Sequence, residues 1–348
     1  MTGDMQPSAW KAGVLPPVEE VRKGLWSIPV PIPQGVLRYV LVYAVELDHG
    51  LALVDAGWDT PEAWSALNEG LLVAGGSISD VRAVVVSHIH RDHSGQAGRI
   101  RELTGAWIGL HPADAALLGS RYASSEQFAA SVCAFLDIAG VPYGAYPEVN
   151  TPPTQVGSFD RLSPPDRLIE DGDDLGLQGW DLRAIWTPGH SPGHLCLFSE
   201  SRRLLFTGDH VLPRISPNIS IHSIQNPNPL ADFLDSLEKV KHVDCDEVLP
   251  GHEWRFSSLR ERASELRQHH RFRLDEILRT LAGASELTCW EIATRLTWSR
   301  ELDTSSPFVQ RTASGETLAH LALLESEGTV TREPGIPARF RSVAPPND

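Results

Sequence analysis

The sequence predicts an α/β protein in which helices cover mixed β-sheets, followed by a smaller, mainly helical domain. Short apolar, β-branched runs alternate with helical segments between residues 36 and 249, and several successive strands are joined by hairpin-like turns. That combination is typical of layered α/β domains with mixed sheets. After residue 256 the sequence changes to helical patterns rich in arginine and glutamate and ends in a short hairpin.

The composition of the chain excludes disordered and fibrous proteins. The chain has 348 residues, of which 41% are hydrophobic and 22% charged, as in ordinary globular proteins. The sequence shows no apolar run of about 18 residues and no basic segment followed by an apolar one near its start. Its cysteines are widely spaced, at Cys133, Cys196, Cys245 and Cys289, which favours a reducing compartment. We therefore expect a cytoplasmic protein without a membrane segment.

The charge is distributed unevenly along the chain. The net charge is −15, yet residues 254–348 hold 13 arginines, no lysine and 13 acidic residues, so residues 1–253 carry the whole excess. A surface that binds polyanions normally has the opposite sign. Duplex DNA is therefore an unexpected partner, and RNA is disfavoured.

Residues 1–23 contain Pro7, Pro16 and Pro17 without any periodicity and predict an irregular arm before a domain of residues 24–256. Thr60 and Pro61 are typical of a helix start, because they can act as N-cap and first helical residue. Strands are predicted at residues 36–45, 51–54, 81–86, 106–110, 182–186, 194–199, 204–207 and 247–249. Helices are predicted at residues 60–72, 95–103 and 229–240.

Residues 112–170 differ from the rest of this domain. Two helical stretches, from residue 112 and over 126–138, precede a segment rich in proline, glycine and tyrosine. We interpret this region as an insertion over one edge of the domain, where loops commonly determine specificity. Tyr143, Tyr146 and Arg161 combine polar ends with reach and are its predicted substrate contacts.

Residues 257–348 predict a compact C-terminal domain. Helices are expected at residues 257–281, 290–296 and 315–327, and a two-stranded wing at residues 329–331 and 338–341.

A histidine cluster directly follows the predicted strand 81–86. Residues 88–93 read His-Ile-His-Arg-Asp-His. In an extended chain, residues two apart project to the same side, so His88 and His90 can bind one metal ion. Asp92 and His93 lie in the following turn and can face a second ion. Imidazole and carboxylate are ligands for zinc, with iron and manganese as alternatives.

Two ions need further ligands, and three other strand ends supply them. Each ends in a glycine-containing turn that can direct the next side chain toward a common centre. These turns are Thr-Pro-Gly-His ending at His190, Thr-Gly-Asp-His at residues 207–210, and Leu-Pro-Gly-His ending at His252. The combination predicts a dinuclear metal site.

Together these motifs resemble those of the metallo-β-lactamase superfamily over residues 24–256. The resemblance implies a four-layered αβ/βα sandwich with the site at one edge. It also implies that His88, His90 and His190 bind one ion, that Asp92, His93 and His252 bind the other, and that Asp209 bridges them. The Val-Asp-Ala-Gly stretch at residues 54–57 resembles the family loop in which the aspartate, here Asp55, supports the site without ligating.

Other histidines are less certain members of the site. His194 begins a predicted strand, and a supporting or packing role is expected for it. His210 adjoins the bridging position and can contact either substrate or a metal ligand. Residues 257–348 resemble a winged-helix-like tail in one branch of the superfamily that includes a mitochondrial endoribonuclease. However, residues 316–327 contain no lysine or arginine, which groove reading requires. A packing role, or a contact in a homodimer, is therefore the preferred interpretation.

Two adjacent divalent ions lower the pKa of a water between them to ~7 and so supply a hydroxide nucleophile. Asp92 and Asp209 are the predicted catalytic residues, which would orient this nucleophile or relay its proton. A carboxylate at the bridging position, here Asp209, resembles the glyoxalase II, lactonase and ribonuclease Z branches. The insertion, with its apolar helix and its prolines and tyrosines, favours a small or acyl-bearing substrate in a covered pocket. We therefore expect hydrolysis of a thioester or another ester-like substrate, including lactones. A phosphodiesterase or endoribonuclease acting on RNA is the first alternative, and a non-hydrolytic di-iron redox or sensor protein is the second.

Overall fold

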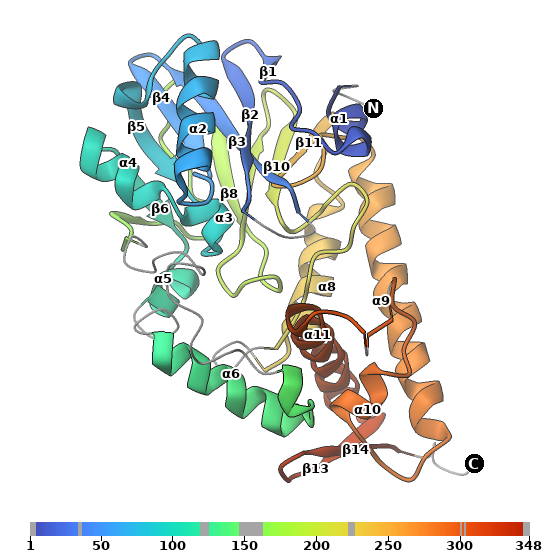
Figure 1. Cartoon of the computed structure of the whole chain (residues 1–348). Helices are drawn as coiled ribbons and strands as arrows, with labels where there is room; N and C mark the ends of the chain where they lie inside the picture. Colours follow the sequence, from blue (N-terminus) through green and yellow to red (C-terminus); the bar gives the residue numbers. More distant parts are fainter. Residues whose placement is uncertain are drawn as a thin grey trace. The chain divides into compact units, whose positions relative to one another are not determined.

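The computed structural model describes residues 5–33, 37–118, 125–145, 163–221, 227–299, 301–302 and 304–343. The chain divides into two compact units (Figure 1). Unit 1 comprises Met1–Ser120, Gly157–Pro217 and Ser236–Ala263, and unit 2 comprises Arg121–Val156, Asn218–Asp235 and Ser264–Asp348.

Unit 1 contains two mixed sheets. The larger has the order β1-β2-β3-β4-β5-β6-β7, antiparallel from β1 to β4 and parallel from β4 to β7. The smaller has the order β11-β10-β9-β8 and is antiparallel except for the parallel β10–β11 pair. The strands of the larger sheet are β1 (Glu19–Arg22), β2 (Leu25–Pro31), β3 (Tyr39–Leu47), β4 (Gly50–Val54), β5 (Val81–Val85), β6 (Trp107–Leu110) and β7 (Arg167–Leu168). Those of the smaller sheet are β8 (Leu182–Trp186), β9 (Leu195–Ser199), β10 (Leu204–Gly208) and β11 (Glu247–Pro250).

Two apolar layers hold unit 1 together. Alternate residues of β3 and of the smaller sheet form one core, in which the rings of Tyr43 and Phe206 meet edge to face at 5.3 Å. The opposite face of the larger sheet packs against helices α2 (Pro61–Val73) and α4 (Ala97–Thr104), as Figure 1 shows for α2. The cap at Thr60 is as predicted, since its hydroxyl accepts a hydrogen bond from the Ala63 N–H at 3.2 Å. Helices outside mixed sheets are thus confirmed.

The irregular arm predicted for residues 1–23 is wrong. Residues Met5–Ala12 form helix α1, and β1 extends the larger sheet. Gln6 fixes the helix, because its side chain donates to Ser27 Oγ (3.1 Å) and accepts from the Arg255 N–H (2.9 Å). Strand β2 was not predicted either. Its prolines lie beyond the Leu25–Ser27 stretch that pairs with β1, so they leave that pairing intact.

The segment of residues 112–170 does not form one separate insertion. Helix α5 (Pro112–Leu118) belongs to unit 1, and β7 pairs with β6 at the edge of the larger sheet. Helix α6 (Ser125–Ala139) belongs to unit 2, where the Ile138 carbonyl accepts a hydrogen bond from the Ala338 N–H at 2.9 Å. Residues far apart in sequence therefore decide where each part of the segment lies.

Unit 2 combines helices with a small antiparallel sheet of order β12-β14-β13. The sequence predicts only a two-stranded wing, but Leu287 and Thr288 add a third strand beside β14. Besides α6, unit 2 contains α10 (Cys289–Ala293), α11 (Pro307–Ser326), β12 (Leu287–Thr288), β13 (Val330–Glu333), β14 (Arg339–Ser342), and parts of α8 (Pro229–Val240) and α9 (Leu259–Ala282). None of the helices in the described ranges of the chain is long and apolar enough to cross a membrane.

Helix α11 is buried over much of its length and places polar groups inside unit 2. Nδ1 of His270 lies 3.1 Å from Nε2 of His320, and both rings are buried. Burial lowers the pKa of His320 to about 4. Glu316 precedes His320 by one helical turn, and burial raises the pKa of its carboxyl to about 7 despite the nearby Arg273.

Glu316→Gln is expected to stabilise the protein above pH 7. A carboxyl with a raised pKa binds its proton more tightly in the folded state, so the free energy of unfolding falls as pH rises from about 4.5 to about 7. The glutamine cannot ionise, so it should add about 1–3 kcal/mol at pH 8 and little at pH 5. Urea unfolding at both pH values measures this. Exposed Glu325→Gln on the same helix is the control, and equal effects of the two variants would contradict the prediction.

Candidate metal centre

The predicted ligands project from four strand ends of unit 1. His88 to His93 follow β5, His190 follows β8, Asp209 follows β10 and His252 follows β11. The structure brings all seven predicted ligands together, in overlapping groups whose ligand atoms lie within 4.8 Å of one another.

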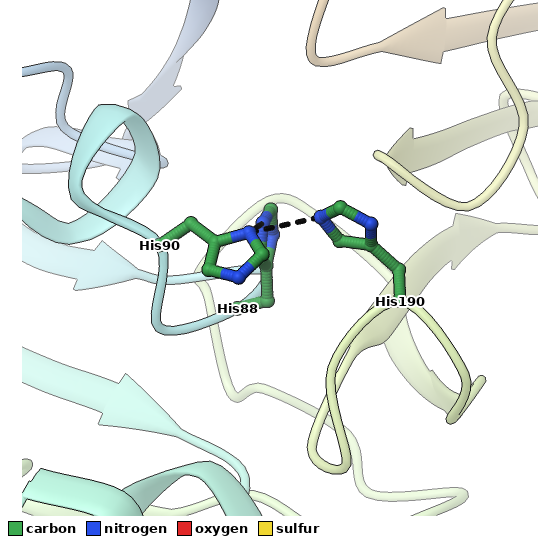
Figure 2. A group of neighbouring side chains, drawn as sticks. All are labelled: His88, His90 and His190. Carbon is green, nitrogen blue, oxygen red and sulfur yellow. Dashed lines mark hydrogen bonds between the residues drawn. The ribbon is translucent and has the colours of Figure 1, made fainter. Parts of the chain in front are cut away.

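The first group consists of three imidazoles. Figure 2 shows the rings of His88, His90 and His190 directed toward one another. Nδ1 of His90 lies 3.0 Å from Nε2 of His88 and 2.9 Å from Nε2 of His190. His88 is fully buried and His190 nearly so.

The second group consists of Asp92, His93 and His252. Nε2 of His252 lies 3.3 Å from Nε2 of His93 and 3.3 Å from Oδ2 of Asp92. Asp209 reaches both groups: its Oδ1 lies 3.4 Å from Nε2 of His93 and 3.3 Å from Nε2 of His252, and its Oδ2 lies 3.6 Å from Nε2 of His190.

Hydrogen bonds on the far sides of the rings determine which ring nitrogens are free to bind a cation. His252 Nδ1–H donates to the Tyr39 carbonyl at 2.9 Å, because a carbonyl can only accept. His93 Nδ1–H donates to Asp55 Oδ2 at 2.7 Å. In the neutral rings both Nε2 atoms therefore carry lone pairs, and these face each other beside two carboxylates. Because converging acceptors need positive charge between them, this donor set fits a metal ion.

The same logic extends to the first group through Ser87. The Ser87 hydroxyl donates its hydrogen to Asp55 Oδ2 at 3.0 Å. Its oxygen therefore accepts a hydrogen bond from Nδ1–H of His88, 3.1 Å away. His88 Nε2 is then the lone-pair nitrogen that points at His90. Asp55 also accepts from the Ser87 N–H at 2.7 Å, and its own backbone has a φ of 65°. Asp55 thus orients rings of both groups.

The protonation equilibria of the two groups shift in opposite directions. Burial and the neighbouring imidazoles of His93, His90 and His190 hold the pKa of His88 well below its usual range. Burial opposes protonation of His252, but Asp209 and Asp92 raise its pKa to about 10. Burial raises the pKa of Asp92, whereas His93 and His252 lower it to a net value of about 2. The Asp-rich group therefore attracts positive charge strongly, as an ion site must.

The remaining predicted residues occupy different places. His194 is buried; its Nδ1–H donates to Thr187 Oγ1 (2.8 Å), and its Nε2 accepts from the Asp209 N–H (3.1 Å). His210 is also buried, 5.9 Å from the His194 ring, and burial lowers its pKa to about 3. Tyr143 belongs to unit 2 and its side chain is 86% exposed. Tyr146 and Arg161 lie outside the described residues.

Sequence reasoning missed Ser87, the Tyr39 carbonyl and Asp114. The Pro-Ala-Asp stretch at residues 112–114 was interpreted only as a helix start. In the structure, the buried Asp114 carboxylate accepts hydrogen bonds from both histidine loops. An aspartate shortly after the end of the predicted strand 106–110 was the available signal, and a main-chain acceptor such as the Tyr39 carbonyl leaves no signal in a sequence.

Gly251→Ala is expected to weaken metal binding by about 10- to 100-fold without unfolding the protein. A Cβ at this position would lie 2.6 Å from His93 Cε1 and 2.9 Å from Asp209 Oδ1, so it would displace both side chains. Metal titration in the presence of a competing chelator measures the change. Gly283→Ala is the control, because the nearest atom to its added Cβ is 3.9 Å away. Unchanged affinity in the Gly251 variant would contradict the geometry described.

Comparison with known proteins agrees with this fold and site. Residues 35–252 match the family model of the metallo-beta-lactamase superfamily. The chain belongs to the metallo-β-lactamase superfamily, and its clustered histidines and aspartates make it a metallo-hydrolase of that class.

Two similar proteins match most of the chain, and a third matches about a quarter of it. A metallo-beta-lactamase family protein from Thermus thermophilus is 34% identical, with a TM-score of 0.79, and the match covers 93% of this chain and 100% of that one. The probable metallo-hydrolase YqjP of Bacillus subtilis strain 168 is 27% identical over 88% of this chain and 93% of its own. An atrochrysone carboxyl ACP thioesterase of Aspergillus fumigatus is 33% identical over 89 residues, or 26% of each chain.

Proposed function

We propose that this protein is a dinuclear metal-dependent hydrolase of thioesters or other ester-like substrates, including lactones. His88, His90 and His190 would hold one ion, Asp92, His93 and His252 the other, and Asp209 would contact both. The observation that carries the proposal is the convergence of lone-pair nitrogens and carboxylate oxygens from four strand ends. Zinc is the preferred metal for this donor set, and iron or manganese would also fit it.

Two divalent ions bound here would act as Lewis acids and lower the pKa of water to ~7. The protein's own residues supply position. Asp92 and Asp209 present carboxylate oxygens beside the imidazoles, where they can orient a water molecule and receive its proton. His194 fixes the main chain of Asp209 by accepting its N–H. No serine or cysteine nucleophile is needed.

Substrate chemistry follows from three supporting points. A carboxylate at the position of Asp209 resembles the glyoxalase II, lactonase and ribonuclease Z branches, and a thioesterase is among the similar proteins. The net charge of −15 disfavours nucleic acid. Helix α11, which includes the region that resembles a recognition helix, is largely buried in unit 2 and lacks lysine and arginine over residues 316–327. We propose that this winged-helix-like part packs within the protein or contributes to a homodimer.

A hydrolysis screen with the metal-loaded full chain tests the proposal. Thioesters, lactones, bis-p-nitrophenyl phosphate and short single-stranded RNAs are offered in parallel, and metal content is measured on the same sample. Turnover of thioesters or lactones is expected to exceed that of both phosphodiesters. Preferential cleavage of RNA would replace the proposal with the endoribonuclease alternative. A coloured di-iron centre without any hydrolysis would favour the redox or sensor alternative.

A further inference from the structure

We propose that Asp114 is a positioning residue that sets the distance between the two histidine loops of the first metal group. This inference rests on the proposed metal centre. His88 and His90 follow β5, whereas His190 follows β8 in the other sheet, so the three imidazoles share an ion only if the two loops are held in register. Within the ligand set, the two loops are joined by the 2.9 Å contact between His90 Nδ1 and His190 Nε2, and bound metal would take up both of these nitrogens.

The Asp114 carboxylate joins the two loops directly. Its Oδ2 accepts from the Ile89 N–H at 2.8 Å, in the first loop, and from the Ser191 hydroxyl at 2.8 Å, in the second. Its Oδ1 accepts from the Gly193 N–H at 2.7 Å. Ile89 lies between two of the predicted ligands and Ser191 directly follows the third, so the carboxylate acts within one residue of all three.

Burial makes these bonds strong and specific. The Asp114 side chain is fully buried, and a buried carboxylate is stable only when donors satisfy it. Gly193 is also required, because a Cβ there would lie 2.5 Å from the Asp114 nitrogen and 2.7 Å from its Cβ and Cγ. The chain therefore approaches Asp114 as closely as glycine allows.

A second contact holds the start of α5 in the same place. The His111 ring stacks on Trp186, with centroids 5.1 Å apart and planes 6° from parallel. Trp186 ends β8, and its Nε1–H donates to the Pro192 carbonyl at 2.9 Å, in the His190 loop. The start of α5 is thus attached to this loop by both a ring stack and a carboxylate, which leaves Asp114 little freedom to move away.

Asp114→Asn is the primary test. An amide can keep its oxygen toward Ile89 and Ser191, but its NH₂ group then faces the Gly193 N–H, so two donors meet. The affinity for the first ion is expected to fall about 10- to 100-fold, the usual effect of losing a partner outside the ligand set. Chelator competition and the absorption spectrum of the cobalt-substituted protein measure this independently of activity. Saturating metal should restore much of kcat.

Asp181→Asn is the matched control. The Asp181 carboxylate likewise accepts several hydrogen bonds, from the hydroxyls of Ser199 and Ser201 and from the Ser201 N–H. However, Asp181 precedes β8, whereas His190 follows that strand. Equal metal affinities and cobalt spectra for the two variants would overturn the inference.

Ser191→Ala provides a milder second variant in case Asp114→Asn does not fold. It removes only one donor to Asp114 and is expected to lower the affinity several-fold; unchanged affinity in this variant would overturn the inference. A wild-type protein that binds no metal would instead refute the proposed function itself, so the two failures are distinguishable.

Discussion

Removal of the bound metal is expected to abolish hydrolysis and to lower the thermal stability of unit 1. Seven ligand side chains converge on one region, and an ion that binds the folded ligand set but not the unfolded chain adds its binding free energy to the stability of the fold. Elemental analysis of the purified chain should approach two ions per chain. Activity should disappear on treatment with a strong chelator and return in proportion to the metal added back.

The control for metal removal is the same chelator treatment followed immediately by excess metal, which separates ion loss from irreversible unfolding. Full activity in a sample shown by elemental analysis to be metal-free would refute the mechanism. A plateau of activity after one equivalent would show that only one of the two groups is needed for turnover.

Asp209→Asn is expected to reduce turnover by more than about 100-fold, beyond the range typical of partners outside the ligand set. Asp209 is the only predicted ligand in the described structure whose carboxylate oxygens approach histidines of both groups. The amide keeps the shape of the side chain but removes the negative charge that would offset two neighbouring dications. Steady-state rates and metal content, measured on the same preparation, test this.

Two variants frame the interpretation of Asp209→Asn. His194→Ala removes the acceptor of the Asp209 N–H and should cost about 10- to 100-fold, less than the loss of the carboxylate itself. Asp244→Asn removes an exposed carboxylate that pairs with Arg203 and should leave turnover unchanged. Near-normal turnover and metal occupancy in Asp209→Asn would show that the ligand assignment is incorrect.

The sequence by itself determined the class of fold and the candidate ligands. Short strands ending in glycine-containing turns place their following residues at sheet edges, and this local rule identified the turns that contain His88 to His93, His190, Asp209 and His252. The resemblance to the superfamily implied which side chains in these turns are ligands. The alternation of strands and helices indicated the mixed sheets in the same way. Both depend on interactions between residues close in the chain, which a pattern can report.

Only the tertiary structure decided how that ligand set is oriented and supported. The Tyr39 carbonyl accepts from His252 and Asp114 accepts from the main chain beside His88, although both are distant from these ligands in the sequence. Helix α1 likewise depends on Gln6 meeting Ser27 and Arg255, although the local sequence is rich in proline. Such roles follow from burial, because a buried polar group must find a partner wherever the fold brings one, and sequence distance places no limit on that choice.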